Sequence, residues 1–372
     1  MFKKSSISGI TLESAGLVAL ADLPTVAMRT ALMGTASWID ILVLAPGMHQ
    51  QQSANEVNRS EFPQTGSLTN GYVFRIENPA MVSYFQCIGC TRYLVTAVVE
   101  QKLNSKGLKN PYFDLSPPQH HTFYMTGPFV ALLYLLCLIL TIVVFALVGS
   151  IRDWWALAVL GMLILSRMIN VFIIKCRASD SSIWKGGKEE GPGDLLIVLS
   201  QDRWVRLQGK LSDVKRVMAG QWLRDEDRVE SLAIGFATLL VYAAAALAGN
   251  VSTTGSLLIA LLLLCSVALL ALCNSLTHQL QMYNCIMWED KSLRRPYTRR
   301  LDMVRALVKE VDLVRKKEGE WGAWAVNMQL IRKSELDSIP LPGRTSMTDH
   351  SQEQNPSDGS VSIGSMVTAT TV

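Results

Sequence analysis

Two long stretches of the chain contain no charged residue, and they dominate its hydrophobic pattern. No Asp, Glu, Lys or Arg occurs from 122 to 151, and none occurs from 231 to 288. A helix needs about 20 apolar residues to cross the roughly 30 Å of hydrocarbon in a bilayer. The pattern therefore predicts four transmembrane helices, arranged as one hairpin over residues 127–174 and another over residues 231–274.

The segment between the two hairpins, residues 175–230, has a different pattern. Residues 194–200 form an apolar run typical of a buried strand, and residues 203–208 alternate apolar and polar positions. The pair Gln201-Asp202 between them suits a tight turn. We expect a small α+β loop region here.

The N-terminal region, residues 1–126, contains two semi-apolar segments at 30–46 and 80–99. Each carries one charged residue near its middle, Asp40 or Arg92, and the first is short for a span. We favour an arrangement in which neither crosses, so that both lie in the interface or pack on the bundle. In the six-helix alternative both cross, and Asn58 of the sequon Asn58-Arg59-Ser60 lies in the lumen as a glycosylation site.

The distribution of Lys and Arg sets the expected orientation. The loop at 175–230 holds eleven of them, whereas the hairpin around Asn250 holds none. Because basic loops stay on the cytosolic side, we expect this loop and the C-terminus to be cytosolic. Residues 275–335 form a basic amphipathic cytosolic region, and residues 336–372, rich in Ser, Thr, Pro and Gly, a disordered tail. The predicted fold class is thus a mainly α membrane protein.

Composition narrows the functional classes. Charged residues make up 18% of the chain and the net charge is +4, which is too small to indicate nucleic-acid binding. The sequence has no phosphate-binding loop, nucleophile elbow or zinc-protease motif, so we expect neither an enzyme nor a cofactor or metal site. Cys87 and Cys90 form a CxxC pair without the second ligand pair that a zinc site needs.

Arg167 is the most informative polar residue, because it lies inside a predicted span. It precedes Lys175 by eight residues, which places it about 12 Å below the predicted cytosolic helix end. One interpretation is snorkelling or pairing inside the bundle. The other is a site for an anion or a lipid headgroup, shared with Asn170 one turn along, with Asp40 as the nearest candidate counter-charge.

The region 291–324 is the predicted partner site. It includes a basic helix at 297–315 with one apolar face, placed just after the last span. Such a helix can lie along an anionic leaflet or bind a protein, and a solvated face is the ordinary alternative.

A resemblance supports the membrane class. The strings Gly193–Gly209 and Gly220–Asp225 resemble a segment of uncharacterised multi-pass integral membrane proteins of filamentous fungi, and so do Gly34–Trp38 and Ala45–His49. That resemblance implies a membrane protein and no catalytic residues. We expect a non-enzymatic scaffold or partner-binding membrane component; the alternative is an oligomeric channel or small-solute transporter. A homo-oligomer is compatible with either.

Overall fold

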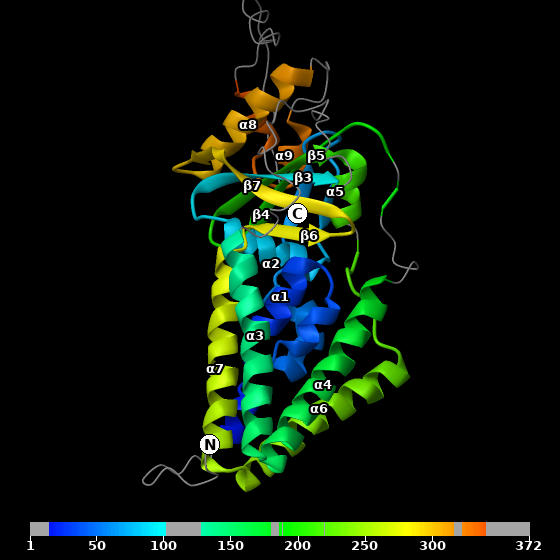
Figure 1. Ribbon diagram of the computed structural model, residues 1–372. Helices are drawn as coiled ribbons and strands as arrows, with labels where there is room; N and C mark the ends of the chain where they lie inside the picture. Colours follow the sequence, from blue (N-terminus) through cyan, green and yellow to red (C-terminus); the bar gives the residue numbers. More distant parts are fainter. Residues whose placement is uncertain are drawn as a thin grey trace, which may run out of the picture.

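The computed structural model describes residues 15–101, 128–179, 186–187, 189–218, 220–315 and 322–339. Its long helices run side by side below a mixed sheet, with further helices beyond the sheet (Figure 1). Short helices and 3-10 turns precede the first long helix: η1 (Ala15–Leu20), α1 (Thr25–Met33), η2 (Trp38–Leu42), η3 (Met48–Glu56) and α2 (Pro79–Ile88).

Four helices of the described chain are long and apolar enough to cross a membrane, as the hydrophobic pattern predicts. They are α3 (Pro128–Ile151), α4 (Trp154–Ser179), α6 (Arg228–Leu247) and α7 (Thr253–Leu276). Large apolar side chains stand exposed along them, for example Leu132, Leu232 and Leu264, as on a surface solvated by lipid. The tight turns of both hairpins lie at one end of the bundle, here called the hairpin end, and the sheet lies at the other, the sheet end (Figure 1).

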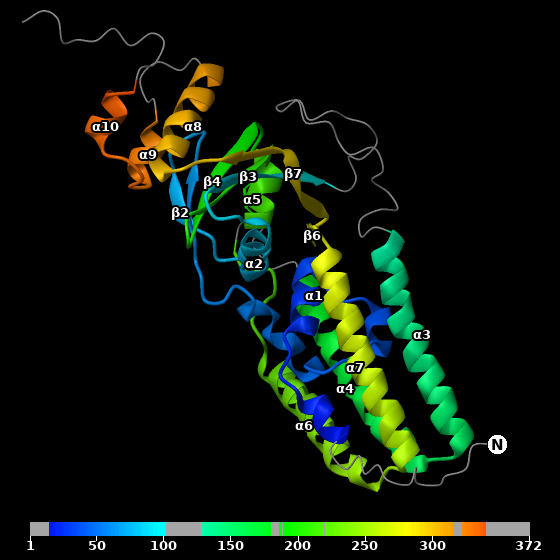
Figure 2. The same cartoon turned by 90° about the vertical axis from the view of Figure 1, so that its left-hand side faces the viewer.

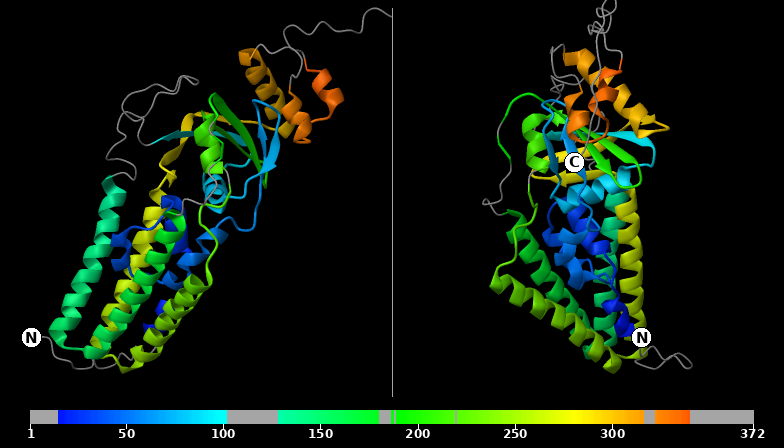
Figure 3. Two further views of the ribbon diagram at one scale, coloured as in Figure 1. Left: turned by 90° about the vertical axis from the view of Figure 1, so that its right-hand side faces the viewer. Right: turned by 180° about the vertical axis from the view of Figure 1, so that it is seen from behind.

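The two semi-apolar segments at 30–46 and 80–99 form no long helix. The first contains the end of α1 and the turn η2, and the second contains α2 and a strand, so the described residues give no support to the six-helix alternative. Instead, residues 15–57, here called the wedge segment, lie between the α3–α7 pair and the α4–α6 pair (Figures 1 and 3).

The wedge segment enters from an unexpected side. Its first turn, η1, contacts α6, α7 and the turn η5 (Ala248–Asn250) at the hairpin end, whereas α1 contacts the sheet. The described chain therefore runs from the hairpin end to the sheet end before α3 begins, without forming a long helix on the way. Irregular backbone at this depth is tolerated where neighbouring helices cover it. Val43, Leu44 and Ala45 are buried in this way, whereas Trp38 and Ile39 of η2 are exposed.

The prediction of a small α+β loop region is wrong in extent. Seven strands form one sheet in the order β2-β1-β4-β5-β3-β7-β6, with only the β3–β5 pair parallel. The strands come from three chain segments that the hairpins separate. They are β1 (Gln64–Ser67), β2 (Val73–Arg75), β3 (Tyr93–Gln101), β4 (Pro192–Leu199), β5 (Arg203–Lys210), β6 (Gln279–Met282) and β7 (Cys285–Pro296).

The predicted strands at 194–200 and 203–208 are confirmed as an antiparallel hairpin. Ser200, Gln201 and Asp202 connect the two strands, and Gln201 and Asp202 both have positive φ, a backbone conformation common in tight hairpin loops. The charged stretch from Lys291 to Pro296, which begins the predicted partner site at 291–324, belongs to β7.

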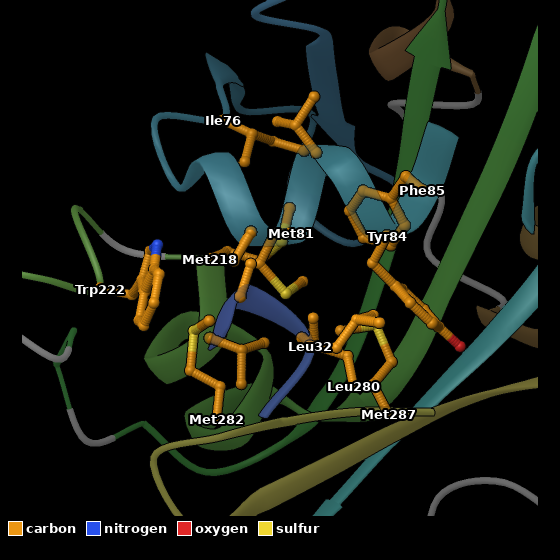
Figure 4. Packing of buried hydrophobic residues seen from close by; sticks show 14 of the residues in the cluster. Leu32, Ile76, Met81, Tyr84, Phe85, Met218, Trp222, Leu280, Met282 and Met287 are labelled. Carbon is orange, nitrogen blue, oxygen red and sulfur yellow. The ribbon is translucent and has the colours of Figure 1, made fainter. Parts of the chain in front are cut away.

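The sheet buries a different apolar cluster on each face, since successive strand residues point to opposite sides. On the face toward the membrane helices, Ile197, Val205 and Leu207 pack with α2 and α5 (Leu211–Met218). Figure 4 shows this cluster, where Met81 and Tyr84 of α2 meet Met282 and Met287 of the last two strands. On the far face, Leu196 and Trp204 pack with the C-terminal helices.

The predicted amphipathic helix at 297–315 is α8 (Arg300–Arg315), and its apolar face is buried against the sheet. Val304, Leu307 and Val308 are fully buried there. The apolar face is thus not free to lie on a leaflet, and α8 is separated from the membrane helices by the sheet (Figure 2).

The far layer also includes α9 (Ala323–Asn327) and α10 (Lys333–Asp337). Leu336 and Ile339 are buried in the same cluster, so the packed part of the chain extends beyond the predicted boundary at 336. The rest of the predicted tail, 340–372, lies outside the described residues.

Candidate basic pocket at the sheet end of the helices

Arg167 of α4 lies inside the bundle and is held by the wedge segment. Its Nε donates to the backbone oxygen of Asp40 at 3.0 Å, and its Nη1 donates to Oε1 of Gln51 at 2.6 Å. Gln51 in turn donates to Oγ1 of Thr30. The side chain is 4% exposed. It therefore does not snorkel, and neutral acceptors of the wedge segment fix its position.

Asn170 belongs to a second, neighbouring network. Gln52 of η3 donates through Nε2 to the side-chain and backbone oxygens of Asn170, at 3.2 and 3.1 Å. The Oε1 of Gln52 accepts from Arg177, which also pairs with Glu226 at 3.1 Å. Asn170 thus ties α4 to η3, and its polar atoms are satisfied within the protein.

A cavity of about 480 Å³ opens beside Arg167 at the sheet end. It is lined by parts of α1, η2, α3, α4, α7 and β6, so the wedge segment, three of the four membrane helices and the sheet contribute to it. Its charged side chains are Arg29, Lys175, Arg167 and Asp40, and hydroxyl groups of Thr30, Thr35, Ser37 and Tyr134 stand among them. We call it the basic pocket.

None of the three cations of the basic pocket takes part in an ion pair within the described chain. Arg29 donates to Oγ1 of Thr277 at 3.0 Å and lies over the Tyr134 ring. Lys175 reaches the backbone oxygen of Ala36 at 3.4 Å and lies over the Trp38 ring. Carbonyl oxygens, hydroxyls and aromatic faces hold these cations without neutralising them.

Asp40 is the single carboxylate among the pocket's lining residues, and both of its oxygens accept hydrogen bonds from groups other than the three cations. Tyr134 donates its hydroxyl to Oδ1, and the backbone N–H of Ser37 donates to Oδ2 at 2.8 Å. The predicted pairing with Arg167 is made through the backbone oxygen of Asp40 and not through its carboxylate. The pocket therefore keeps an excess of two positive charges.

Sequence reasoning finds Arg167 and misses Arg29 and Lys175. Lys175 sits at the end of a predicted span, where a cation is ordinary for a cytosolic boundary, and Arg29 belongs to a short helix without a span-like pattern. The fold of the wedge segment brings the three cations together, and no local sequence pattern predicts that fold. Gln51 and Gln52 are missed for the same reason.

The predicted glycosylation site is closed in this structure. The Asn58 side chain is 4% exposed, and its Nδ2 donates to the backbone oxygen of Glu61. Glycosylation would require that amide to be free.

The CxxC cysteines do not form a site with other ligands. Cys87 is on α2 and Cys90 follows it, and both are free thiols. Burial raises the pKa of the Cys87 thiol, against the opposing effect of Arg59 and Arg203, which does not favour a reactive thiolate. Over the described ranges no three His, Cys, Asp or Glu side chains gather as metal ligands.

Comparisons with known proteins add no assignment: no family model, curated protein or solved structure matches this chain. The resemblance to fungal membrane proteins stays a prediction.

Proposed function

We propose that this chain is a non-enzymatic multi-pass membrane protein that binds a phosphate-type anion in the basic pocket. In this proposal the sheet end faces the cytosol, and the sheet with its far helical layer serves as the partner-binding part of a scaffold. The observation that carries the proposal is the set of three cations, Arg29, Arg167 and Lys175, without an ion-pair partner among the described residues.

The charge balance of the pocket suits a phosphate monoester. Such a group carries about −1.5 to −2 charges at pH 7 and has three acceptor oxygens. The pocket offers a surplus of two positive charges together with hydroxyl donors. Basic pockets between transmembrane helices at the cytosolic side are a recurring way to hold lipid phosphates.

The described contacts also support coupling between the pocket and the sheet. Gln281 of β6 lines the pocket, and β6 pairs with β7, which carries the exposed basic stretch at 291–295. A protein partner at 291–324 therefore remains part of the proposal. The alternative of an oligomeric channel or transporter stays a prediction.

A binding experiment on the full chain tests the proposal. The protein is purified in a neutral detergent, and glycerol-3-phosphate is added while the unfolding temperature is followed. At 100 times the dissociation constant, binding stabilises the folded state by about 2.7 kcal/mol, which is a measurable upward shift. We expect Lys175→Gln to weaken binding about tenfold or more, since a hydrogen bond to a charged group contributes about 1.5–3 kcal/mol.

Lys210→Gln is the matched control. It removes the same charge from an exposed position at the end of β5, away from the pocket. Equal binding by both variants, or no binding by the native chain, would refute the proposed function.

A further inference from the structure

A separate apolar groove lies nearer the hairpin end than the basic pocket, between the same two membrane helices α3 and α4. It has a volume of about 250 Å³ and its exposed lining is almost entirely carbon. Leu42, Thr141, Ile142, Phe145 and Ile164 line it. Ile142 and Phe145 are exposed, so the groove opens sideways to the lipid-facing surface.

Three elements, η2, α3 and α4, contribute residues to both the pocket and the groove. The turn η2 contributes Asp40 to the pocket and Leu42 to the groove, and it contacts both α3 and α4. On α3, Tyr134 of the pocket precedes Thr141 of the groove by seven residues, which is about 10 Å along the helix axis.

On α4, Ile164 of the groove lies one turn below Arg167 of the pocket, on the same helix face. A headgroup site and an apolar channel therefore follow one another in the direction in which a lipid extends from its phosphate into the hydrocarbon.

We propose that the anion of the basic pocket is the headgroup of a phosphomonoester lipid, of the class of phosphatidic acid, whose acyl chain lies in the groove between α3 and α4. This inference rests on the proposed function and names its ligand class. The charge surplus selects the headgroup, and a dianionic monoester fits it better than a monoanionic diester. The carbon lining of the groove excludes the free phosphate ion as its occupant.

The groove orients the acyl chain of the bound lipid and contributes less to the binding free energy. An acyl chain that leaves the bilayer for a protein groove exchanges one apolar surrounding for another, so the gain comes from packing. The attraction to the cations is the larger contribution, and the groove decides which molecules can present a phosphate while one chain stays in the membrane plane.

Photolabelling of the native chain tests this assignment. The full chain is placed in phosphatidylcholine nanodiscs that contain either phosphatidic acid or phosphatidylcholine with a diazirine in the middle of one acyl chain. After irradiation, labelled peptides are mapped. We expect phosphatidic acid to label residues 141–145 and 164 several-fold more than phosphatidylcholine does, and the excess to disappear in Lys175→Gln.

Two matched variants test the groove: one fills it and the other leaves it open. Ile164→Trp fills it, whereas Leu165→Trp adds the same bulk one position along, on an exposed side chain that does not line it. The first should lose the labelling preference for phosphatidic acid and keep its affinity for glycerol-3-phosphate, which also shows that it folds. The second should keep both.

The outcomes separate the two proposals. If glycerol-3-phosphate binds but both lipids label the groove equally in the native chain, the acyl-chain assignment is wrong and the anion site stands. If neither glycerol-3-phosphate nor phosphatidic acid binds, the proposed function fails and the lipid assignment fails with it.

Discussion

Removing the carboxylate of Asp194 should loosen the centre of the sheet. Asp194 and Arg206 lie diagonally across β4 and β5 on the face that α8 covers. Arg206 donates to both carboxylate oxygens, with Nε–Oδ1 at 2.9 Å and Nη2–Oδ2 at 2.6 Å. The two side chains are 9% and 6% exposed. The bidentate geometry and the burial make this the strongest ion pair of the described sheet.

The expected loss of stability follows from the charge that Asp194→Ala leaves uncompensated. In Asp194→Ala the guanidinium of Arg206 stays buried and keeps Glu310, at 2.7 Å from Nη1, as its charged partner. Breaking a buried pair by removing one partner costs about 3–5 kcal/mol, because the remaining charge is no longer compensated. Since Glu310 remains, we expect a loss near the lower end, about 3 kcal/mol.

Hydrogen exchange measures this loss where it occurs. Exchange of buried strand amides reports the free energy of local or global opening. A loss of about 3 kcal/mol accelerates the exchange of peptides from residues 192–210 by about two powers of ten. Peptides from α3 and α7 should change much less if the sheet opens separately from the membrane helices.

A control variant and a double variant test whether the buried charge of Arg206 causes the loss. Asp202→Asn removes a carboxylate charge from the turn of the same hairpin and keeps a residue that tolerates the positive φ there; the pair of Asp202 with Arg300 is about half exposed. Such surface pairs contribute about 0–1 kcal/mol, so little change is expected. The double variant Asp194→Leu/Arg206→Met replaces both charges by apolar groups and should recover most of the protection. An acceleration below tenfold in Asp194→Ala, or no recovery in the double variant, would contradict the argument.

Three other predictions follow from single features. Gly34 has a φ of +66° and an added Cβ would lie 2.3 Å from the backbone oxygen of Gln281, so Gly34→Ala should lower the unfolding temperature by the equivalent of about 1–3 kcal/mol. Burial alone would raise the pKa of Glu310, but hydrogen bonds and attraction from Arg206 and Arg295 hold it below its ordinary value of 4.5. Its stabilising contribution is therefore present above that value and is lost as pH falls through the folded pKa; Glu310→Gln should flatten the fall of unfolding temperature below pH 4.5. Treatment with a glycosidase should leave the mobility of the chain unchanged, and a shift abolished by Asn58→Gln would show that the burial of Asn58 is wrong.

The four membrane helices could be predicted because each is specified by its own residues. A run such as the one between Phe129 and Ile151 needs no distant partner to identify it. The hairpin of β4 and β5 is similarly local, since Gln201 and Asp202 mark its turn. These elements depend on period and composition alone.

The full sheet and the basic pocket depend on contacts between distant residues. The stretch Lys291–Pro296 carries too many charges to be recognised as a strand, yet it belongs to β7. Only Arg295 and Pro296 pair with β3, beyond an irregularity in the register, and most side chains of the stretch are exposed. Arg29, Arg167 and Lys175 meet only because residues 15–57 fold back between the helix pairs. No periodicity within one segment encodes such a meeting.

The wedge segment has a consequence for the order of assembly during synthesis. Residues 25–29 leave the ribosome early, but they bond to residues made last in the membrane half: Asn274 donates to the backbone oxygen of Thr25, and Arg29 donates to Thr277. These contacts span 249 and 248 positions along the chain. A domain that closes such long loops folds slowly, and its unfinished surfaces stay exposed meanwhile. Until α7 is inserted, α1 lacks its contacts with that helix, so a stall or truncation before 277 should leave residues 25–29 accessible to proteases and chaperones.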